Sequence, residues 1–366
     1  MMNITIYGTM TSGHQMIVST IKKYLDRALL PYHLQEVSDV QVFLQKSIDS
    51  VPAIQIDDQP IVSLKANGAF NQSLRKIIRT MLEKKDFGQT PRILAPIDFS
   101  KASLNALMYA HRLATDMDHL LKVLHVYYPS AVEVNEVTYV DKELVEIRQK
   151  QLDETVENID TDWAGDIVKA AMVDKEFAMG FPGDEIVAQT KNDQTEMVVM
   201  ATTGESGMLK KLFGSVSTKV LSKAHCPVLL VPENAHYKKF NNVLLACDDV
   251  DDDDEYFQFL KRFVHNFDAT VHAVHIEDEK EELEEEKREM REELLGVFPK
   301  DKVEIAVIHS DDVAGSIEDY AHANDIGLIV MSTERRGFFE QLFHKSTTKE
   351  MAIHTDIPLL VLKKED

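Results

Sequence analysis

The sequence predicts an α/β protein in which two copies of a doubly wound parallel-sheet domain, residues 91–235 and 239–363, follow a smaller α/β domain, residues 1–88. Three observations carry this prediction. Short motifs recur in the same order in the two copies, continuous apolar runs alternate with amphipathic stretches, and residues 1–88 follow a different pattern. A chain of 366 residues is also too long for one ordinary domain.

Residues 1–88 show the element order β-α-β-α-β-β-α, and residues 86–90 form the linker that follows. The last two strands flank the turn Asp57-Asp58-Gln59 and form a hairpin. The predicted strands are Asn3–Tyr7, His33–Val37, Ala53–Ile56 and Pro60–Leu64, and the predicted helices are His14–Leu30, Val40–Ile48 and Asn71–Lys85.

This first domain resembles the thioredoxin-like fold of glutaredoxins. Tyr7 precedes the position of their Cys-x-x-Cys motif, and Ser50-Val51-Pro52 is similar to their Thr-Val-Pro, which implies a cis peptide bond before Pro52. Ser12-Gly13-His14-Gln15 replaces the cysteine pair, and a hydroxyl cannot replace a thiolate in disulfide exchange. We therefore expect a redox-inactive domain, used for packing or dimerisation rather than as a binding module. The sequence identifies no partner for His14, which favours a polar residue at a helix N-terminus over a general base.

The repeat consists of four motif pairs, two separated by 150 residues and two by 131, so the second copy is 19 residues shorter in its middle. The same spacing of 131 relates Ile186 to Ile317. The pairs are Arg92–Asp98 with Asn242–Asp248, Leu124–Val126 with Val274–Ile276, Glu196–Met200 with Gly327–Met331, and Pro227–Val231 with Pro358–Leu362.

Within each copy, short apolar runs indicate strands that are buried on both faces, and amphipathic stretches such as Ser103–Thr115 and Asp184–Lys191 indicate helices. This alternation is typical of parallel βαβ units. Such sheets bind ligands beyond the carboxyl ends of their strands, where the strand order reverses. We therefore expect a site at the loops that follow Asp98, Val126 and Met200.

Several motifs of the first copy resemble the universal stress protein family, which has a Rossmann-like fold. Ile93–Ser100 reads ILAPIDFS, Leu124-His125-Val126 matches the end of the family's second strand, and Cys226–Val231 resembles its last strand. Members that bind ATP carry G-x2-G-x9-G-[ST]. This chain has Ala201 at the first glycine, then Gly204 and Gly214-Ser215 at the required spacing. The resemblance implies binding of ATP or another adenine nucleotide, with or without Mg²⁺.

The residues support a phosphate site independently of the resemblance. Gly204 follows a buried strand, and a residue without a Cβ lets backbone N–H groups approach an anion. Gly214-Ser215 opens a predicted helix, Val216–Ala224, whose first amides and dipole favour an anion. Ser215 and Ser217 add hydroxyl donors. Lys210 and Lys211 in the intervening loop either screen phosphate charge or are simply solvated.

The resemblance also assigns roles within the site. It implies that Pro96 and Asp98 lie at the ribose or adenine end, that Val126 contacts adenine, and that Met200 and Ala201 lie under the ribose. The phosphates are then held by Gly204, Gly214, Ser215, Val216 and the hydroxyl of Ser217. The methyl group of Ala201 either crowds the ligand or is harmless, the second if its backbone φ is negative.

The second copy lacks most of the residues that form this predicted nucleotide site. Asp248 is retained, but Ala246 replaces Pro96. Gly204 aligns with Glu334 or Arg335 and Gly214 with His344 or Lys345, so side chains project where backbone would meet phosphate. We expect no ordinary ATP site there, and we interpret Arg335, Arg336, His344 and Lys345 as a remnant rather than a site for another anion.

The net charge of −22 argues against partners that require a basic surface, namely nucleic acid and anionic membranes. Without an apolar run long enough to span a bilayer or an export signal, we expect a cytoplasmic protein. Cys226 and Cys247 are interpreted as small buried hydrophobes. The acidic run Asp248–Glu255 is interpreted as a solvated loop rather than a Ca²⁺ or Mg²⁺ site, and Glu277–Leu294 as a charged, solvent-facing helix.

The sequence offers no general base, nucleophile or metal cluster beside the predicted phosphate site. The favoured hypothesis is an ATP-binding regulatory protein of the stress response, with one nucleotide per chain and at most weak ATPase activity. The alternatives are a nucleotide-free scaffold and a slow ATPase. The last strands, Val228–Val231 and Leu359–Leu362, are expected to pair within the chain as a pseudo-dimer. A homodimer of whole chains and an unidentified protein partner stay open.

Overall fold

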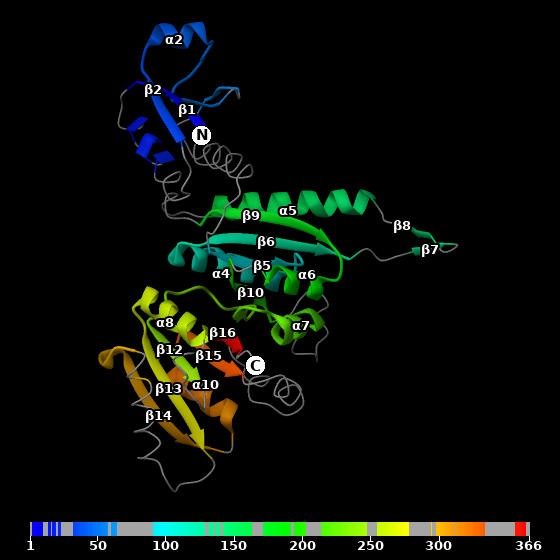
Figure 1. Ribbon diagram of the computed structural model, residues 1–366, viewed down its shortest axis with the longest axis vertical. Coiled ribbons are helices and arrows are strands. Elements are labelled where there is room, and N and C mark those ends of the chain that lie inside the picture. Colours follow the sequence, from blue (N-terminus) through cyan, green and yellow to red (C-terminus); the bar gives the residue numbers. More distant parts are fainter. Residues whose placement is uncertain are drawn as a thin grey trace. The chain divides into compact units, whose positions relative to one another are not determined.

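Figure 1 shows the computed structural model, in which the chain divides into two units, Met1–Thr90 with Asp153–Val173 and Pro91–Leu152 with Asp174–Asp366. In the described part of the chain, no helix is both long and apolar enough to cross a membrane. The structure describes residues 2–9, 14–15, 17–19, 21–22, 32–57, 60–63, 91–128, 132–134, 137–139, 142–162, 171–191, 194–202, 214–246, 255–277, 294, 298–310, 312–333 and 356–363.

The first unit contains a four-stranded sheet in the order β2-β1-β3-β4. Strand β1 pairs in parallel with β2 and antiparallel with β3, and β3 pairs antiparallel with β4. The elements are β1 (Met2–Tyr7), β2 (Tyr32–Val37), α2 (Val40–Gln45), β3 (Ala53–Ile56) and β4 (Val62–Ser63).

These strands confirm the order predicted for residues 1–63, and the bond between Val51 and Pro52 is cis, as expected. Helix α2 begins after Asp39, whose side chain accepts a hydrogen bond from the Gln41 amide. The predicted helix Asn71–Lys85 and the linker 86–90 lie outside the described residues.

The second unit contains a ten-stranded sheet in the order β14-β13-β12-β15-β16-β11-β10-β5-β6-β9, counted over the described residues. A separate hairpin joins β7 (Val132–Val134) to β8 (Val137–Tyr139). The strands of the large sheet are β5 (Arg92–Ile97), β6 (Leu120–Tyr127), β9 (Val173–Met179), β10 (Thr195–Ala201), β11 (Val228–Val231), β12 (Asn242–Ala246), β13 (Thr270–Glu277), β14 (Val303–His309), β15 (Leu328–Thr333) and β16 (Leu359–Lys363).

Three predicted helices, Ser103–Thr115, Asp184–Lys191 and Val216–Ala224, are confirmed within a few residues. Of the predicted helix Glu277–Leu294, Glu277 instead ends strand β13, Leu294 is helical, and residues 278–293 lie outside the described residues. Glu255, at the end of the acidic run, begins a helix that was not predicted. The helices described from residue 91 on are α4 (Lys101–Met117), α5 (Lys142–Asp162), α6 (Pro182–Gln189), α7 (Ser215–Lys223), α8 (Glu255–Phe267), η1 (Lys300–Lys302) and α10 (Val313–Ala323). The residues of α5 from Asp153 on belong to the first unit.

The sheet consists of two halves with the same strand order, which meet at β11 and β16 and whose repeat is therefore confirmed (Figure 1). The expected pairing of the last strands is also confirmed. Leu229 lies opposite Leu360 in an antiparallel ladder, whereas the ladders β5–β6, β5–β10, β10–β11, β12–β13, β12–β15, β13–β14 and β15–β16 are parallel. This pairing covers an edge that each half would otherwise expose.

A continuous apolar core runs across the junction of the two halves. It joins Leu94, Val198 and Leu230 of the first half to Leu359 and Ile329 of the second, all buried. Strand β11 is buried at all four positions, which explains why its sequence is a continuous apolar run rather than an alternating one.

The segment between the halves is fixed by polar and aromatic contacts. Tyr237 donates a hydrogen bond to the Asp116 carboxylate at 2.6 Å. Its ring packs edge-on against Tyr109 and Phe240, at centroid distances of 5.1 and 5.8 Å. Asn105 in α4 donates to two carbonyls of this segment, at 3.2 and 2.9 Å. The two halves are therefore held by more than one pair of strands.

One polar position differs between the halves in a way that makes the second half sensitive to pH. Lys122 of β6 forms an ion pair with Glu176 at 2.6 Å, and the corresponding residue of β13 is His272. His272 is 3% exposed, lies 3.5 Å from Glu304 and 3.2 Å from the Tyr320 hydroxyl, and its Nε2 has no hydrogen-bond partner among the described residues. Burial lowers the pKa of His272 despite the opposing effect of Glu304.

We expect acid to destabilise the folded chain in part through His272. A histidine pKa that is lower in the folded state favours folding above its unfolded pKa of about 6.5, and that contribution is lost as the pH falls through the folded value. The free energy of unfolding, measured in urea at pH 7.5 and pH 5.5, should therefore fall less in His272→Gln than in the unmodified chain. Equal losses in both proteins would contradict this assignment.

Candidate functional site

The site lies where the winding of the first half changes direction. From β5 the chain proceeds to β6 and β9 on one side, then crosses to β10 and β11 on the other. Because crossovers between parallel strands are right-handed, the connections that run in opposite directions place their helices on opposite faces. The loops that follow β5 and β10 therefore leave the sheet toward opposite faces. The crevice between these loops is where α/β sheets bind ligands.

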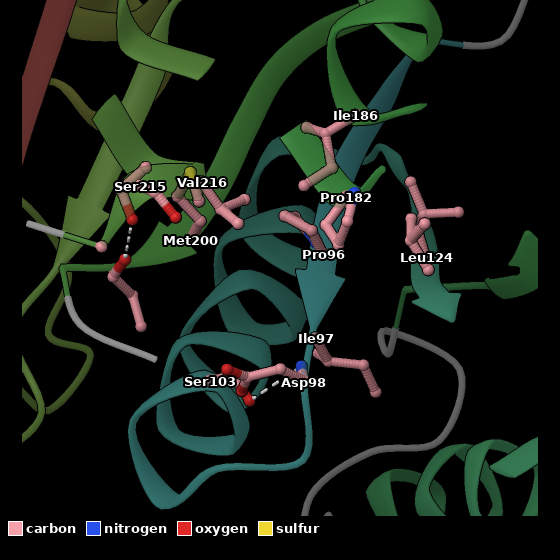
Figure 2. Close-up of a pocket in the computed structure, with 14 residues that line it drawn as sticks. Pro96, Ile97, Asp98, Ser103, Leu124, Pro182, Ile186, Met200, Ser215 and Val216 are labelled. Atoms are coloured by element: carbon pink, nitrogen blue, oxygen red, sulfur yellow. Dashed lines mark hydrogen bonds between the residues drawn. The ribbon is translucent and has the colours of Figure 1, made fainter. Parts of the chain in front are cut away.

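A cavity of about 500 Å³ occupies this crevice (Figure 2). The structure brings nine of the ten predicted site residues to its wall, and Gly204 lies outside the described residues. The predicted residues in the wall are Pro96, Asp98, Val126, Met200, Ala201, Gly214, Ser215, Val216 and Ser217, and the further ones are Ile97, Ser103, Leu124, Pro182 and Ile186.

One end of the cavity is apolar. Leu124 and Val126 lie two residues apart on β6 and so face the same side of the sheet, and both line the cavity together with Ile186 of α6. Figure 2 labels Leu124 and Ile186. Pro182 opens α6 at a position where the missing N–H costs no hydrogen bond. The sequence already identified Leu124 and Ile186 as repeated positions. Their proximity depends on the crossover connection that packs α6 against β6.

The loop from β5 to α4 holds Asp98 in a fixed arrangement. Its Oδ1 accepts hydrogen bonds from the amide and the hydroxyl of Ser100, at 3.0 and 2.6 Å. The Ser100 hydroxyl in turn accepts from the amide of Ser103 at 3.2 Å and caps α4. Asp98 is the one ionisable side chain among the lining residues that the structure describes.

Phe99, next to Asp98, has a φ of 65°, in the left-handed region that residues with a side chain rarely adopt. Its ring packs against that of His125 at 4.4 Å, and the Arg148 guanidinium lies 5.7 Å from its centroid. Such a conformation costs on the order of 1–3 kcal/mol and persists where the surroundings enforce it. The packing of Phe99 thus fixes the direction in which Asp98 projects.

The other end of the cavity is formed by the first turn of α7. Gly214 is its N-cap residue, with φ −64° and ψ 154°, so the backbone does not require a glycine here. A Cβ built on Gly214 would find its nearest heavy atom, the Ser217 Oγ, at 4.0 Å. The missing side chain therefore leaves cavity space beside the amides of Ser215, Val216 and Ser217, where the helix dipole is positive.

The end of β10 and the start of α7 are joined directly. The Ser217 hydroxyl, 4% exposed, donates to the Ala201 carbonyl at 3.3 Å. Ala201 is buried in the strand, and it is absent from the residues with positive φ among the described non-glycine positions, which are Ser47, Asp57, Phe99, Asp118, Asp268 and Asp325. The backbone φ of Ala201 is therefore not positive, which is the condition under which its methyl group was expected to be harmless.

Helices α6 and α7 are held together by Lys219. Its ammonium group lies 2.6 Å from the Asp184 carboxylate, and its side chain crosses Gly183 so closely that a Cβ there would lie 2.8 Å from the Lys219 Cδ. Gly183 thus permits the close approach of the two helices that form opposite walls of the cavity.

Other candidate residues have structural roles or lie beyond the described part. Burial raises the pKa of the Cys226 thiol to about 12, so it stays a neutral core group; Cys247 is not described. Among the described residues, no group of three or more His, Cys, Asp or Glu side chains is placed to hold a metal ion. The remnant positions of the second copy lie within 334–350, and most of the acidic run lies within 247–254, both outside the description.

In the first unit, the expectation that His14 has no partner was wrong. Its Nε2 lies 3.1 Å from the Glu36 carboxylate, and its ring is 2% exposed. The ring also lies against Gly8, where a Cβ would be 2.3 Å from the His14 Nδ1. Sequence reasoning missed this pair because it depends on the parallel pairing of β1 with β2, which brings distant segments together. His14 is therefore a buried residue of this unit whose ring is hydrogen-bonded to Glu36.

Comparison with known proteins matches the repeated part of the chain. The sequence profile of the universal stress protein family matches residues 90–232 and 239–363. A universal stress protein of Methanocaldococcus jannaschii is 28% identical over 143 residues, which are 38% of this chain and 81% of that protein. The universal stress protein YxiE of Bacillus subtilis is 31% identical over 144 residues, 38% of this chain and 97% of that protein.

Among solved structures, a universal stress protein from Archaeoglobus fulgidus covers 76% of this chain and 100% of its own, with 22% identity and a TM-score of 0.60. This likeness concerns the fold. Another solved structure, 20% identical over 40% of this chain with a TM-score of 0.31, is a universal stress protein in complex with cAMP.

Two serines of α7 allow the structural part of the site to be tested separately from ligand binding. Ser217→Ala removes the buried hydrogen bond to Ala201 and should lower the free energy of unfolding by about 1 kcal/mol. Ser215→Ala changes an exposed residue and should shift it by less than about 0.5 kcal/mol. Urea denaturation of both variants without nucleotide measures the difference, and equal effects would contradict the geometry.

Proposed function

Because this chain belongs to the universal stress protein family, we propose that it is a regulatory protein of the stress response that binds one adenine nucleotide per chain, in the first copy of the domain. The observation that carries the proposal is the cavity itself. One end of it is apolar and suits a purine base, and the other presents helix amides and the Ser215 hydroxyl to a space that no side chain of the described residues fills.

At the base end, the proposal places adenine against Leu124, Val126 and Ile186, which are buried and apolar. Asp98 and Pro96 lie between this end and the helix, at the position proposed for the ribose (Figure 2). A carboxylate accepts hydrogen bonds from ribose hydroxyls, and the Oδ1 bonds to Ser100 hold it in place for that purpose.

At the phosphate end, the amides of Ser215, Val216 and Ser217 would bind the anion, together with the Ser215 hydroxyl. Gly214 matters there because a methyl group would occupy the space that a phosphate oxygen needs. Gly204 would also contact the phosphates, and nucleotide would order the loop Gly204–Gly214 and so alter a surface for a protein partner.

The same chemistry supports little or no catalysis. Hydrolysis of ATP needs a positioned water and neutralisation of developing charge, usually by Mg²⁺. Among the described lining residues the only carboxylate is Asp98, which lies at the nucleoside end. A Mg²⁺ ion would therefore be coordinated chiefly by the phosphates and water, where it would neutralise phosphate charge.

Residues 1–88 are proposed to form a redox-inactive thioredoxin-like domain that serves packing or dimerisation. Its mixed sheet in the order β2-β1-β3-β4 supports this fold. The chain has two cysteines, Cys226 and Cys247, and neither lies in residues 1–88, so thiol–disulfide exchange has no nucleophile there.

Calorimetric titration of the full chain with ATP, ADP, AMP and cAMP tests the proposal. We expect saturable binding of at least one of them with a stoichiometry of one per chain. Gly214→Ala and Ser215→Ala should each weaken binding by about tenfold, because each removes part of the phosphate site. Thr218→Ala, on the same helix but outside the cavity wall, is the matched control and should bind like the unmodified chain.

If none of the four nucleotides binds, the chain is a nucleotide-free scaffold and the proposal is wrong. The extent of catalysis is measured separately as phosphate release from ATP with Mg²⁺. We expect the unmodified chain to release phosphate no faster than the Ser215→Ala variant does. Sustained release that this substitution abolishes would instead establish a slow ATPase.

A further inference from the structure

Two aromatic side chains lie exposed at the apolar end of the cavity, and we call them the aromatic rim. Tyr128 is 52% exposed and Phe181 is 61% exposed. Their rings lie against each other, with centroids 4.7 Å apart and planes inclined by 31°. Exposed apolar groups that gather at one place usually mark a contact surface.

The aromatic rim continues the wall of the cavity. Side chains alternate along β6, so Tyr128, just past the strand end, falls on the side of Leu124 and Val126, which line the cavity. Phe181 is the N-cap residue of α6 and immediately precedes Pro182, which also lines the cavity.

The rim residues are also held in place by the backbone around them. The Gly180 amide donates to the Tyr127 carbonyl at 3.1 Å and ties the end of β9 to the end of β6. Gly180 has a φ of 158°, which residues with a side chain rarely adopt, and a Cβ there would lie 2.6 Å from the Glu185 Oε1, so this connection requires a glycine. The two rings are therefore part of a fixed wall that continues outward from the base end.

The position of the rim relative to the proposed base selects one kind of occupant. The ribose of an adenine nucleotide is attached at N9 of the five-membered ring, so the N6 amine on the six-membered ring points away from the ribose. With the ribose beside Asp98, N6 would point toward the apolar end of the cavity, where Tyr128 follows the lining residue Val126 by two residues.

We propose that the ligand of the first copy is an adenine nucleotide with an apolar or aromatic substituent on N6, which packs on the aromatic rim. This inference rests on the nucleotide function proposed above and specifies its ligand class. The two exposed rings, in contact at an inclination of 31°, offer such a group an apolar surface next to the base. A protein partner fits less well, because two side chains supply far less than the roughly 800 Å² that each partner buries in a stable interface.

Calorimetric titration of the full chain with N6-benzyl-ATP and with ATP tests the inference. The unmodified chain should bind N6-benzyl-ATP about tenfold more tightly, as expected for one added aromatic contact. Tyr128→Ser and Phe181→Ser should each abolish most of this preference and leave the affinity for ATP within about twofold. Tyr128→Phe keeps the ring and should keep the preference.

The matched control is Leu44→Ser, which removes a 76% exposed apolar side chain in α2 and should keep the preference. Circular dichroism of each variant verifies folding. Equal or weaker binding of N6-benzyl-ATP by the unmodified chain overturns the inference while leaving nucleotide binding intact, as does a preference that survives both serine substitutions. Failure of both ligands to bind overturns the nucleotide function itself, and with it this inference.

Discussion

The architecture depends on one constraint, the reversal of winding direction at strand β5. A parallel sheet that grows to both sides of its first strand must separate its crossover helices onto two faces, and it must leave a crevice at the carboxyl ends of the strands on which it turns. Here those strands are β5 and β10, and the crevice is the cavity between the Asp98 loop and the first turn of α7. The other features around it serve to hold this crevice open and shaped. Phe99 fixes the Asp98 loop from one side, and Lys219 ties α6 to α7 on the other.

The two halves share the constraint but differ in what they place in the crevice. The second half repeats the strand order, and its last strand pairs with that of the first, so it completes the sheet and its core. Its sequence has no glycine at the positions that align with Gly204 and Gly214 of the first half. The proposed division is therefore between one half that binds a ligand and one half that supplies the partner surface of a pseudo-dimer within a single chain. Such a design makes the pairing independent of protein concentration, because both surfaces belong to the same molecule.

Much of this was accessible from the sequence, because strands buried on both faces produce apolar runs and repeats preserve their order. The pairing of Val228–Val231 with Leu359–Leu362, and the arrival of Pro96, Asp98 and Gly214 at one crevice, followed from those signals. What escaped were features that arise only in three dimensions. Phe99 adopts a left-handed conformation that its residue type argues against, and His14 meets Glu36 only through strand pairing. Helix α8 was not predicted because it begins at the end of the acidic run, which was interpreted as a loop. The β7–β8 hairpin was not predicted because its sequence contains no turn glycine or proline. Glu277 was assigned to a helix because it begins a highly charged stretch of sequence, but it is the last residue of strand β13.

The central claim is that the free amides at the start of α7 bind phosphate. Amide chemical shifts report this directly when glycine, serine and valine are labelled with ¹⁵N and the full chain is titrated with ADP. The account predicts that the largest shifts belong to Gly214, Ser215, Val216 and Ser217, since a phosphate oxygen would accept their hydrogen bonds. It further predicts that Ser332, at the matching strand end of the second half, stays unchanged. Saturating nucleotide that leaves the α7 amides unshifted, or that shifts only residues of the second half, would contradict the account.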